Sequence, residues 1–347
     1  MKKILIIMII ATVALVTFAG CSSSSDQTVL NVYNWGDYID ESVLADFENE
    51  TGIKINYEMY ATNEDMMVKL TQGGNSYDVI FPSEYIIEKM IKEDMLEPLD
   101  HAKLPNLENI DPKFSELEFD PAYEYSVPYF WGTVGIMYNT EMVNEPVDSW
   151  DILWDEKYKS NILMMDSQRD TIMVALKKLG YSMNTRNVDE LEEAKALLVE
   201  QRPLVLAYVG DNVKDMMIQG EAALAVVWSG EAYGVISENE GFDFVLPKEG
   251  SNYWFDNMVI PKNSENKDAA HQFINYMLDA EVGFKNTDYV GYSTPNMATY
   301  DMLEEEVKAR EGAYPSAEDL NGFEVFVDPG AFIEEYNRIW TEFKASN

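Results

Sequence analysis

The chain has 347 residues, 46% of them apolar and 12% aromatic, which is the composition of a globular protein large enough for two domains of ordinary size. Against 62 Asp and Glu residues stand only 25 Lys and Arg residues, giving a formal net charge of -37. Such a charge repels polyanions, so it argues against binding to nucleic acid and favours a cationic small ligand. Solubility is the alternative explanation for the acidity.

The N-terminus has the pattern of an export signal. Lys2 and Lys3 precede an apolar run over residues 4–16, and small residues lead to Cys21, the single cysteine of the chain. The segment Phe18-Ala19-Gly20-Cys21 resembles a bacterial lipobox, although an aliphatic residue is usual where Phe18 stands. We expect a lipoprotein signal peptide over residues 1–20 and a flexible polar tether over residues 21–27. Lipidation of Cys21 would hold the protein at the membrane surface outside the cytoplasm, on the periplasmic side if two membranes are present. An ordinary secreted protein is the alternative.

The folded body is expected to begin near Thr28 with alternating strands and helices. The pattern predicts strands over residues 29–33, 53–60 and 77–81, and helices over residues 42–50 and 63–72. This βαβαβ order predicts a parallel sheet with helices on both faces, in which ligands bind beyond the carboxyl ends of the strands. The residues that follow the first and third strands and would reach that edge are Trp35, Asp37, Tyr38, Ser83 and Tyr85.

The same alternation recurs in the second half of the chain. Strands are predicted over residues 204–209, 222–228 and 242–246, and helices over residues 212–219, from residue 231, and over about 269–278. Crossings between the halves at about residues 133 and 257 would make both lobes discontinuous. We therefore expect a hinged clamshell in which residues 28–133 plus 257–300 form lobe 1 and residues 134–256 plus 301–347 form lobe 2.

Three short stretches each place a tryptophan within three residues of a carboxylate. An organic cation needs this pairing, because the ring face attracts the charge and covers the methylenes while the carboxylate neutralises the ammonium. Taken alone, each tryptophan is as readily a core aromatic; together, at strand ends beside acids, they favour a cation site. The pairs are Trp35 with Asp37, Trp228 with Glu231, and Trp254 with Asp256.

Signatures of catalysis, metal binding and nucleotide binding are missing from the sequence. The two histidines, His101 and His271, stand in unrelated contexts, and the sequence has no nucleophile elbow, Walker A or G-x-G-x-x-G motif. We expect neither a cofactor nor a metal nor an enzyme. The alternatives are a sugar-binding protein of the same bilobed design and, more remotely, a carbohydrate-active enzyme, since paired acids beside tryptophans also describe glycoside hydrolases.

From about residue 29 to its C-terminus, the chain resembles the bacterial spermidine/putrescine-binding proteins, which capture substrate for polyamine importers of the ATP-binding-cassette (ABC) type. The resemblance implies an α/β, bilobed periplasmic-binding-protein-like fold of type II. It also implies a monomer that captures a polyamine outside the cytoplasm and delivers it to a membrane-embedded ABC permease. The stretches that carry it are Tyr33-Asn34-Trp35, Glu50-Thr51-Gly52-Ile53-Lys54, Ser76-Tyr77-Asp78-Val79, Pro82-Ser83-Glu84-Tyr85, Pro128-Tyr129-Phe130-Trp131-Gly132, Leu179-Gly180-Tyr181-Ser182 and Gly291-Tyr292-Ser293-Thr294-Pro295-Asn296.

The resemblance also implies which residues contact the ligand. The rings that would line the methylene chain are Trp35, Tyr38, Trp228, Trp254 and Tyr292. The acids and hydroxyls that would meet the ammonium groups are Asp37, Ser83, Tyr85 and Asp256, with Asp256 as the central acid.

Three further positions depart from the family pattern. Asp170 matches the second of two family acids, while the first falls at Ser167 or, with a one-residue shift, at Asp166. Glu231 stands where some spermidine-preferring members are neutral and putrescine-preferring ones are acidic. Glu324 stands where some members have a glutamine contact. The choice between a diamine and a triamine is therefore left open.

Overall fold

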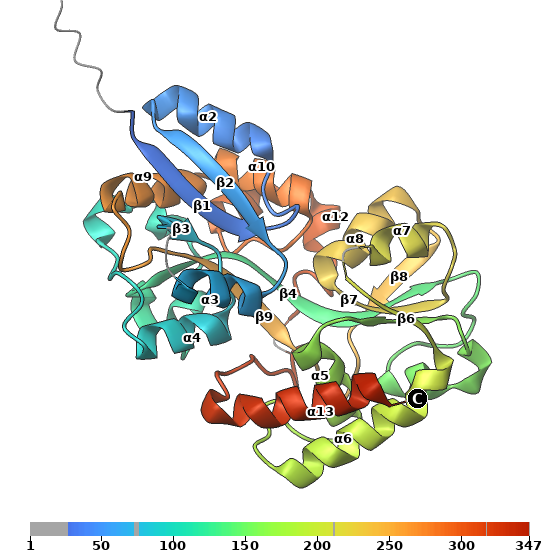
Figure 1. Ribbon diagram of the computed structural model, residues 1–347. Coiled ribbons are helices and arrows are strands. Elements are labelled where there is room, and N and C mark those ends of the chain that lie inside the picture. Colours follow the sequence, from blue (N-terminus) through green and yellow to red (C-terminus); the bar gives the residue numbers. More distant parts are fainter. Residues whose placement is uncertain (1–26, 73–75, 211, 317, 347) are drawn as a thin grey trace, which may run out of the picture.

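The computed structural model describes residues 27–346 except 73–75, 211 and 317 (Figure 1). The expected signal peptide, Cys21 and the tether up to residue 26 lie outside the described residues. Within the described part of the chain, no helix combines the length and apolar character needed to cross a membrane.

One mixed sheet runs through both halves of the molecule. Within the described residues its nine strands follow the order β2-β1-β3-β9-β4-β7-β5-β6, and β8 also pairs with β4. The strands are β1 Val29–Trp35, β2 Lys54–Tyr60, β3 Val79–Ile80, β4 Ser126–Asn139, β5 Ile162–Met165, β6 Val205–Val209, β7 Leu224–Trp228, β8 Phe242–Val245 and β9 Tyr253–Val259.

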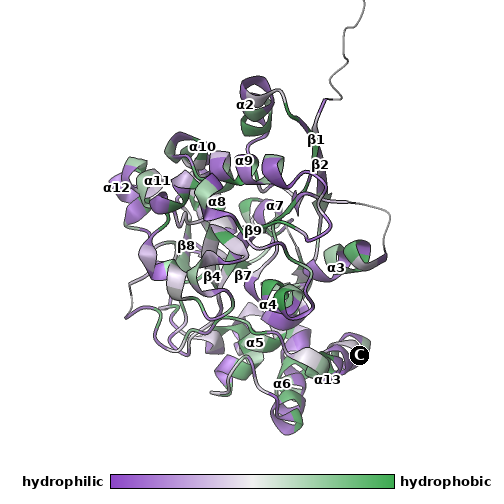
Figure 2. Ribbon diagram, turned by 90° about the vertical axis from the view of Figure 1, so that its left-hand side faces the viewer, coloured by the Kyte–Doolittle hydropathy of each residue, from purple (hydrophilic) through white to green (hydrophobic). Residues whose placement is uncertain are grey.

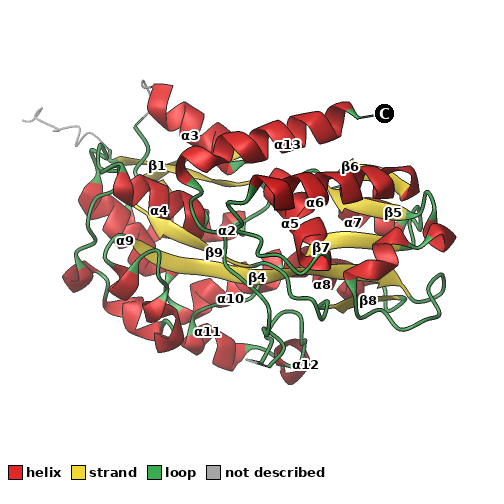
Figure 3. Ribbon diagram, turned by 90° about the horizontal axis from the view of Figure 1, so that it is seen from below, coloured by secondary structure: helices red, strands yellow, loops and turns green. Residues whose placement is uncertain are grey.

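Helices cover both faces of this sheet (Figure 3). They are α2 Glu41–Thr51, α3 Asn63–Gln72, α4 Glu84–Lys92, α5 Gln168–Lys178, α6 Val188–Gln201, α7 Val213–Ile218, α8 Ser229–Glu238, α9 Lys267–Met277, α10 Ala280–Val290, α11 Met297–Met302, α12 Glu305–Lys308 and α13 Ile333–Ala345. The C-terminal helix α13 buries Tyr336, Ile339 and Phe343 against α5 and α6.

Local sequence explains why the first elements form where they do. The Asp40 side chain accepts the N–H of Ser42 at 2.8 Å and begins α2, and Gly52, with φ 74°, ends it. Helix α4 is two-sided, with Ile86, Ile87 and Met90 buried, and Figure 2 shows hydrophobic and hydrophilic residues side by side on it.

The predicted parallel unit is confirmed, but the sheet around it is mixed. β1 pairs in parallel with β2 and with β3, as the βαβαβ pattern requires. The third strand covers only Val79–Ile80, because Pro82 and the start of α4 follow closely. β9 lies antiparallel to both β3 and β4. Antiparallel pairing had not been expected in this half.

The long strand β4 joins the two halves. Its first part, from Ser126 to Thr133, pairs with β9, and its second part, from Val134 to Asn139, pairs with β7 and β8. β9 already runs beside β4 from Tyr253, ahead of the crossing expected at about residue 257. Trp254 and Asp256 are therefore carried by the sheet of the first half, while the lobe limits themselves stay a prediction.

Candidate functional site

The centre of the candidate site is the carboxyl group of Asp256 on β9, which is 6% exposed. The hydroxyl of Tyr38 donates to its Oδ2 at 2.7 Å, and the hydroxyl of Ser83 donates to its Oδ1 at 2.7 Å. Burial raises the pKa of Asp256 to about 6, against the lowering effect of these two hydrogen bonds. Among the described residues, this carboxylate accepts hydrogen bonds from neutral hydroxyl groups and forms no ion pair with a Lys or Arg.

The local sequence explains how these three groups meet. Side chains alternate along a strand, so Trp254 and Asp256 share one face of β9 while Phe255 points to the other and packs against Trp131, with ring centroids 6.4 Å apart. Ser83 precedes α4, but its hydroxyl donates to Asp256 and makes no cap to the helix. The short turn after β1 brings Tyr38 into the same place.

Aromatic rings surround this carboxylate. The Tyr292 ring lies 5.5 Å from the Tyr38 ring and 5.0 Å from the Trp254 ring, in edge-to-face arrangements. A Cβ at Gly230 would come within 2.1 Å of the Tyr292 ring, and one at Gly132 within 2.6 Å of the Trp254 ring. Both rings thus lie so close to the backbone that only glycine fits at positions 230 and 132. Trp254 is only 7% exposed, so its ring also belongs to the core.

Ser83 and Tyr85 are connected through one amide. Asn63, which is 4% exposed, donates from Nδ2 to the Ser83 hydroxyl at 3.0 Å and to the Tyr85 hydroxyl at 3.0 Å. The hydrogen-bonded chain from Tyr85 through Asn63 and Ser83 ends on Asp256. Tyr85 is therefore linked to the central acid, as its place after the third strand suggested.

Trp35 and Asp37 lie at the carboxyl end of β1 but do not join the hydrogen bonds around Asp256. The Trp35 indole N–H donates to the Phe81 carbonyl at 2.7 Å, and the ring packs 4.5 Å from Tyr60. Asp37 is exposed and has a positive φ of 49°. The structure thus places Asp37 at the surface next to the buried group.

Asp170, at the start of α5, is a second buried acid, 6% exposed. It accepts the Ser167 hydroxyl at 2.6 Å and the Asn252 side-chain amide at 3.5 Å, and burial raises its pKa. Asp166 is exposed and forms an ion pair with Lys344 at 2.6 Å. Ser167, rather than Asp166, therefore stands beside Asp170.

The second half contributes one more tryptophan and two more acids. Trp228 ends β7 and is partly buried, and Glu231, 8% exposed, lies in the first turn of α8. Glu324 contacts Lys177 and Ser182 with its carboxylate. Burial acts to raise the pKa of Glu324, but the hydrogen bonds from these two residues outweigh it and leave the pKa lowered. A lysine of the protein therefore already neutralises Glu324.

Sequence reasoning missed two buried groups of this region. Glu84, the first residue of α4, is 1% exposed. Arg169, on α5, is 6% exposed and stacks on Phe326 at 4.3 Å and on Tyr336 at 4.7 Å. Neither stood out, because charged residues at helix starts usually face water. Glu84 directly follows Ser83 and Arg169 directly precedes Asp170 in the sequence. This adjacency to predicted ligand contacts was the one feature of the sequence that could have pointed to them.

The segment over residues 324–328 also contacts the first half. The Phe326 ring lies 6.3 Å from the Tyr85 ring. The N–H of Asp328 donates to Glu88 at 2.7 Å, and the Asp328 carboxylate pairs with Lys92 at 3.2 Å. Helix α4 is thereby joined to a segment that also contacts α5, the loop after α5 and residues 251–253 at the start of β9.

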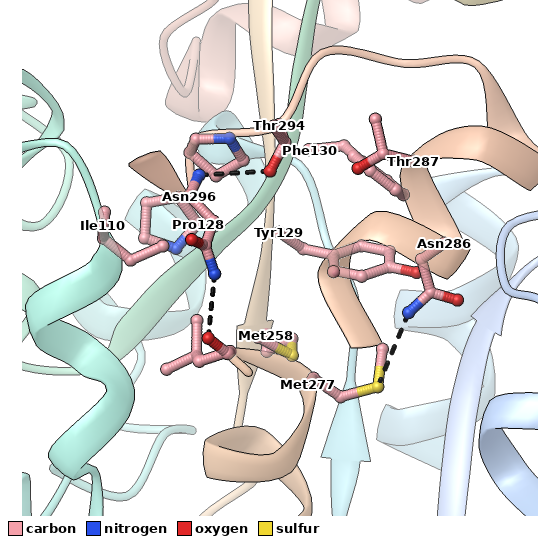
Figure 4. A pocket seen from close by; sticks show the side chains of 13 residues that line it. Ile110, Pro128, Tyr129, Phe130, Met258, Met277, Asn286, Thr287, Thr294 and Asn296 are labelled. Carbon is pink, nitrogen blue, oxygen red and sulfur yellow. Dashed lines mark hydrogen bonds between the residues drawn. The ribbon is translucent and has the colours of Figure 1, made fainter. Parts of the chain in front are cut away.

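A small cavity lies apart from these residues, between β4, β9 and α10 (Figure 4). It measures about 10 Å³ and is lined by residues such as Tyr129, Met258 and Asn286. That volume holds about one water molecule. None of the tryptophans or acids described above lines it, so it plays no part in the candidate site.

Comparison with known proteins places these features in a family. Residues 42–314 match the model of the family described as bacterial extracellular solute-binding protein. The spermidine/putrescine-binding periplasmic protein of Escherichia coli K12 is 37% identical over 339 residues, covering 97% of both chains. The putrescine-binding periplasmic protein PotF of the same organism is 32% identical, covering 93% of both.

Solved structures give the same result. A Listeria monocytogenes protein assigned to a spermidine/putrescine ABC transporter is 46% identical, with a TM-score of 0.89, over 92% of this chain and all of that one. The spermidine/putrescine substrate-binding protein PotD of Streptococcus pneumoniae is 44% identical, with a TM-score of 0.81, over 92% and 99%. The expected bilobed α/β class is thus confirmed, and a solute-binding rather than an enzymatic role with it. The chain belongs to the family of bacterial extracellular solute-binding proteins.

Proposed function

We propose that the protein captures a polyamine outside the cytoplasm for an importer of the ABC type. One observation carries the proposal: a buried carboxylate, Asp256, is held by two hydroxyl groups and lies beside the rings of Trp254, Tyr292 and Tyr38. Asp256 receives one ammonium group of the ligand, and the rings contact its methylenes.

The chemistry of polyamines requires such an arrangement. Aliphatic ammonium groups have pKa values near about 10.4 and are charged at neutral pH, so burying them without a partner costs several kcal/mol. Each matched carboxylate removes that cost. Each ring adds about 0.5 to 2 kcal/mol by attraction between the cation and the π face, which favours a thin alkyl ammonium over neutral solutes.

The names of the relatives agree with this ligand, since those compared bind spermidine or putrescine. A sugar-binding protein is the second candidate, but sugar sites usually add Arg, Lys or Asn donors to their acids. Asp256 and Glu84 accept from hydroxyl and backbone groups in the described structure, and Asp170 from a hydroxyl and an amide. A cation therefore fits Asp256 and Glu84 better than a sugar does, whereas Asp170 already has the Asn252 amide as a donor.

The remaining steps extend the proposal. The two lobes close around the polyamine, with contacts to both lobes favouring the closed state. The closed monomer then presents itself to a membrane-embedded permease. The lipidated Cys21 and the polar tether keep it at the membrane surface during this cycle, because two acyl chains give a firm anchor.

A thermal-shift panel tests the function. Putrescine, cadaverine, spermidine, spermine, choline and maltooligosaccharides are each added to the purified mature chain. A ligand at a hundredfold excess over its Kd stabilises the fold by about 2.7 kcal/mol, a rise of several degrees in Tm. We expect this rise with at least one polyamine and none with the sugars. Stabilisation by oligosaccharides alone would overturn the proposal.

A further inference from the structure

Glu84 is a buried acid with no assigned role. It is 1% exposed, its Oε2 accepts the backbone N–H of Phe255 at 3.0 Å, and its Oε1 is buried without a hydrogen-bond partner among the described residues. Phe255 is the residue between Trp254 and Asp256 on β9. One oxygen of Glu84 is therefore fixed on the strand that carries the central acid, while the other is left to bind something else.

The charged groups that act most strongly on Glu84 are acids. Asp256 on β9 and Asp170 on α5 both act on its carboxyl through their charge, and Tyr253 on β9 feels the charge of Glu84 in turn. On its own helix, Tyr85 also feels that charge. The cation in this region, Arg169, stacks on Phe326 and Tyr336 and lies 6.0 Å from the Tyr85 ring.

These surroundings make the protonated form of Glu84 the stable one at neutral pH. Burial raises the pKa of Glu84 to about 8, outweighing the N–H of Phe255, and the charges of Asp256 and Asp170 add to the rise. A cation entering between these acids reverses that balance, because it favours the ionised carboxylate.

We propose that Glu84 is a further specificity-determining residue, an acid near Asp256 and Asp170 that meets an additional ammonium group of the ligand and releases its proton to solvent when that group arrives. The inference deepens the proposed function and rests on it. The acids on which it is built come from both halves of the molecule. A triamine presents one more ammonium group than a diamine, so it gains more from Glu84.

A purely structural role predicts something different. If Glu84 only accepts the N–H of Phe255, then Glu84→Gln keeps an acceptor in place and changes neither ligand preference nor proton release. The ligand-binding role and the purely structural role therefore predict different results for the single variant Glu84→Gln.

The experiment is titration calorimetry of the whole mature chain at pH 7 in phosphate and in Tris, whose heats of ionisation differ. With a pKa of about 8, roughly 0.9 of Glu84 is protonated at pH 7, whereas a pKa of about 6 leaves only about 0.1 of Asp256 protonated. We expect wild type to release close to one proton per spermidine. In E84Q the release falls to a small fraction, and spermidine affinity drops at least tenfold while putrescine affinity changes less than threefold.

The control is Glu93→Gln, which removes an exposed carboxylate at the far end of the same helix and is expected to behave as wild type. Unchanged proton release or unchanged preference in E84Q would overturn the inference. So would a wild-type release near zero, which needs no variant and holds even if E84Q does not fold. A wild-type chain that binds no polyamine would instead overturn the proposed function itself.

Discussion

Two acidic regions of this molecule use the same residue types in opposite ways. Around β9, Asp256 and Glu84 accept hydrogen bonds from hydroxyl and backbone groups, and their pKa values are raised to about 6 and about 8. Around α6 and α13, Glu192 pairs with Lys195 and with Arg338, and hydrogen bonds from these cations lower its pKa.

The difference shows which carboxylates can contribute to the free energy of binding a cationic ligand. An acid whose pKa is raised by burial is costly to ionise, and a cation that arrives from outside removes that cost. An acid already paired with a lysine gains little from a second cation. By this criterion, the region around Asp256 is suited to bind a cation and the region around α6 and α13 is suited to hold helices together.

The sharpest way to break the comparison is Asp256→Asn. A buried ammonium group would then lose its charged partner, which costs about 2 to 5 kcal/mol, or about thirtyfold to several thousandfold in Kd. Titration calorimetry with spermidine and putrescine measures the loss. Melting of the ligand-free variant serves as the control and is expected to match wild type or exceed it at pH 8. Near wild-type binding would remove Asp256 from the site.

Acidification is expected to have the next largest effect. Binding needs ionised Asp256, and with a pKa of about 6 only about a tenth of it is ionised at pH 5, so the affinity for putrescine, which gains little from Glu84, falls about tenfold between pH 7 and pH 5. The stability of the ligand-free protein depends on pH in the opposite direction. Because the folded pKa lies above the ordinary value of 3.8, the contribution of Asp256 is fully present below that value and is lost as pH rises through 6.

Calorimetry at pH 5, 6 and 7 checks this dependence, with Asp256→Asn as the matched control. Putrescine is the ligand here, because it gains little from Glu84. The variant lacks Asp256 as a titrating group, so its putrescine affinity should change much less over this interval than that of wild type. An affinity that stays constant or rises on acidification in wild type would contradict the assignment.

Trp254→Phe should produce a smaller loss, about 0.5 to 1 kcal/mol of polyamine affinity, because a weaker π face replaces the indole. Alanine is a poor choice here, since Trp254 is largely buried and its truncation would also cost about 3 to 5 kcal/mol of folding free energy. The control is Trp131→Phe, whose ring packs on Phe255 at the opposite face of β9. That variant should alter melting and leave Kd unchanged; the reverse pattern would exchange their roles.

The smallest effect is expected from Asp166→Asn, which breaks the exposed pair with Lys344. The unfolding free energy should change by about 1 kcal/mol or less, and polyamine affinity by less than about twofold. Ser167→Ala, which removes the hydrogen bond that the Ser167 hydroxyl donates to Asp170, should weaken binding more. A larger loss in the Asp166 variant would assign the ligand contact to Asp166 after all.

Much of the fold could be predicted because its signals are local. Asn63–Gln72 forms a helix with the predicted ends, and α2, which Gly52 ends, extends the predicted helix over residues 42–50 by one residue at each end. β9 was harder to predict, since its centre carries Asp256 and Asn257, which interrupt the apolar pattern. Those polar residues are buried because partners distant in sequence, such as Tyr38, satisfy them. A short stretch of sequence around β9 does not show which distant residues will satisfy its buried polar groups.

The site divides in the same way. Strand-end reasoning brought Tyr38 and Ser83 to one edge, and both donate to Asp256 in the structure. It could not foresee that Lys177 neutralises Glu324, 147 positions away, or that Lys344 pairs with Asp166, 178 positions away. Whether a carboxylate is available to a ligand depends on such distant partners.

The two glycines under the aromatic rings limit how this protein can be re-engineered as a biosensor. A methyl group at Gly230 or Gly132 would collide with Tyr292 or Trp254, so neither backbone position tolerates a new recognition group. Room for a bulkier amine has to come from shortening the rings themselves. Libraries that vary positions 254 and 292 and keep both glycines fixed should therefore yield more folded, ligand-responsive variants than libraries that randomise all four.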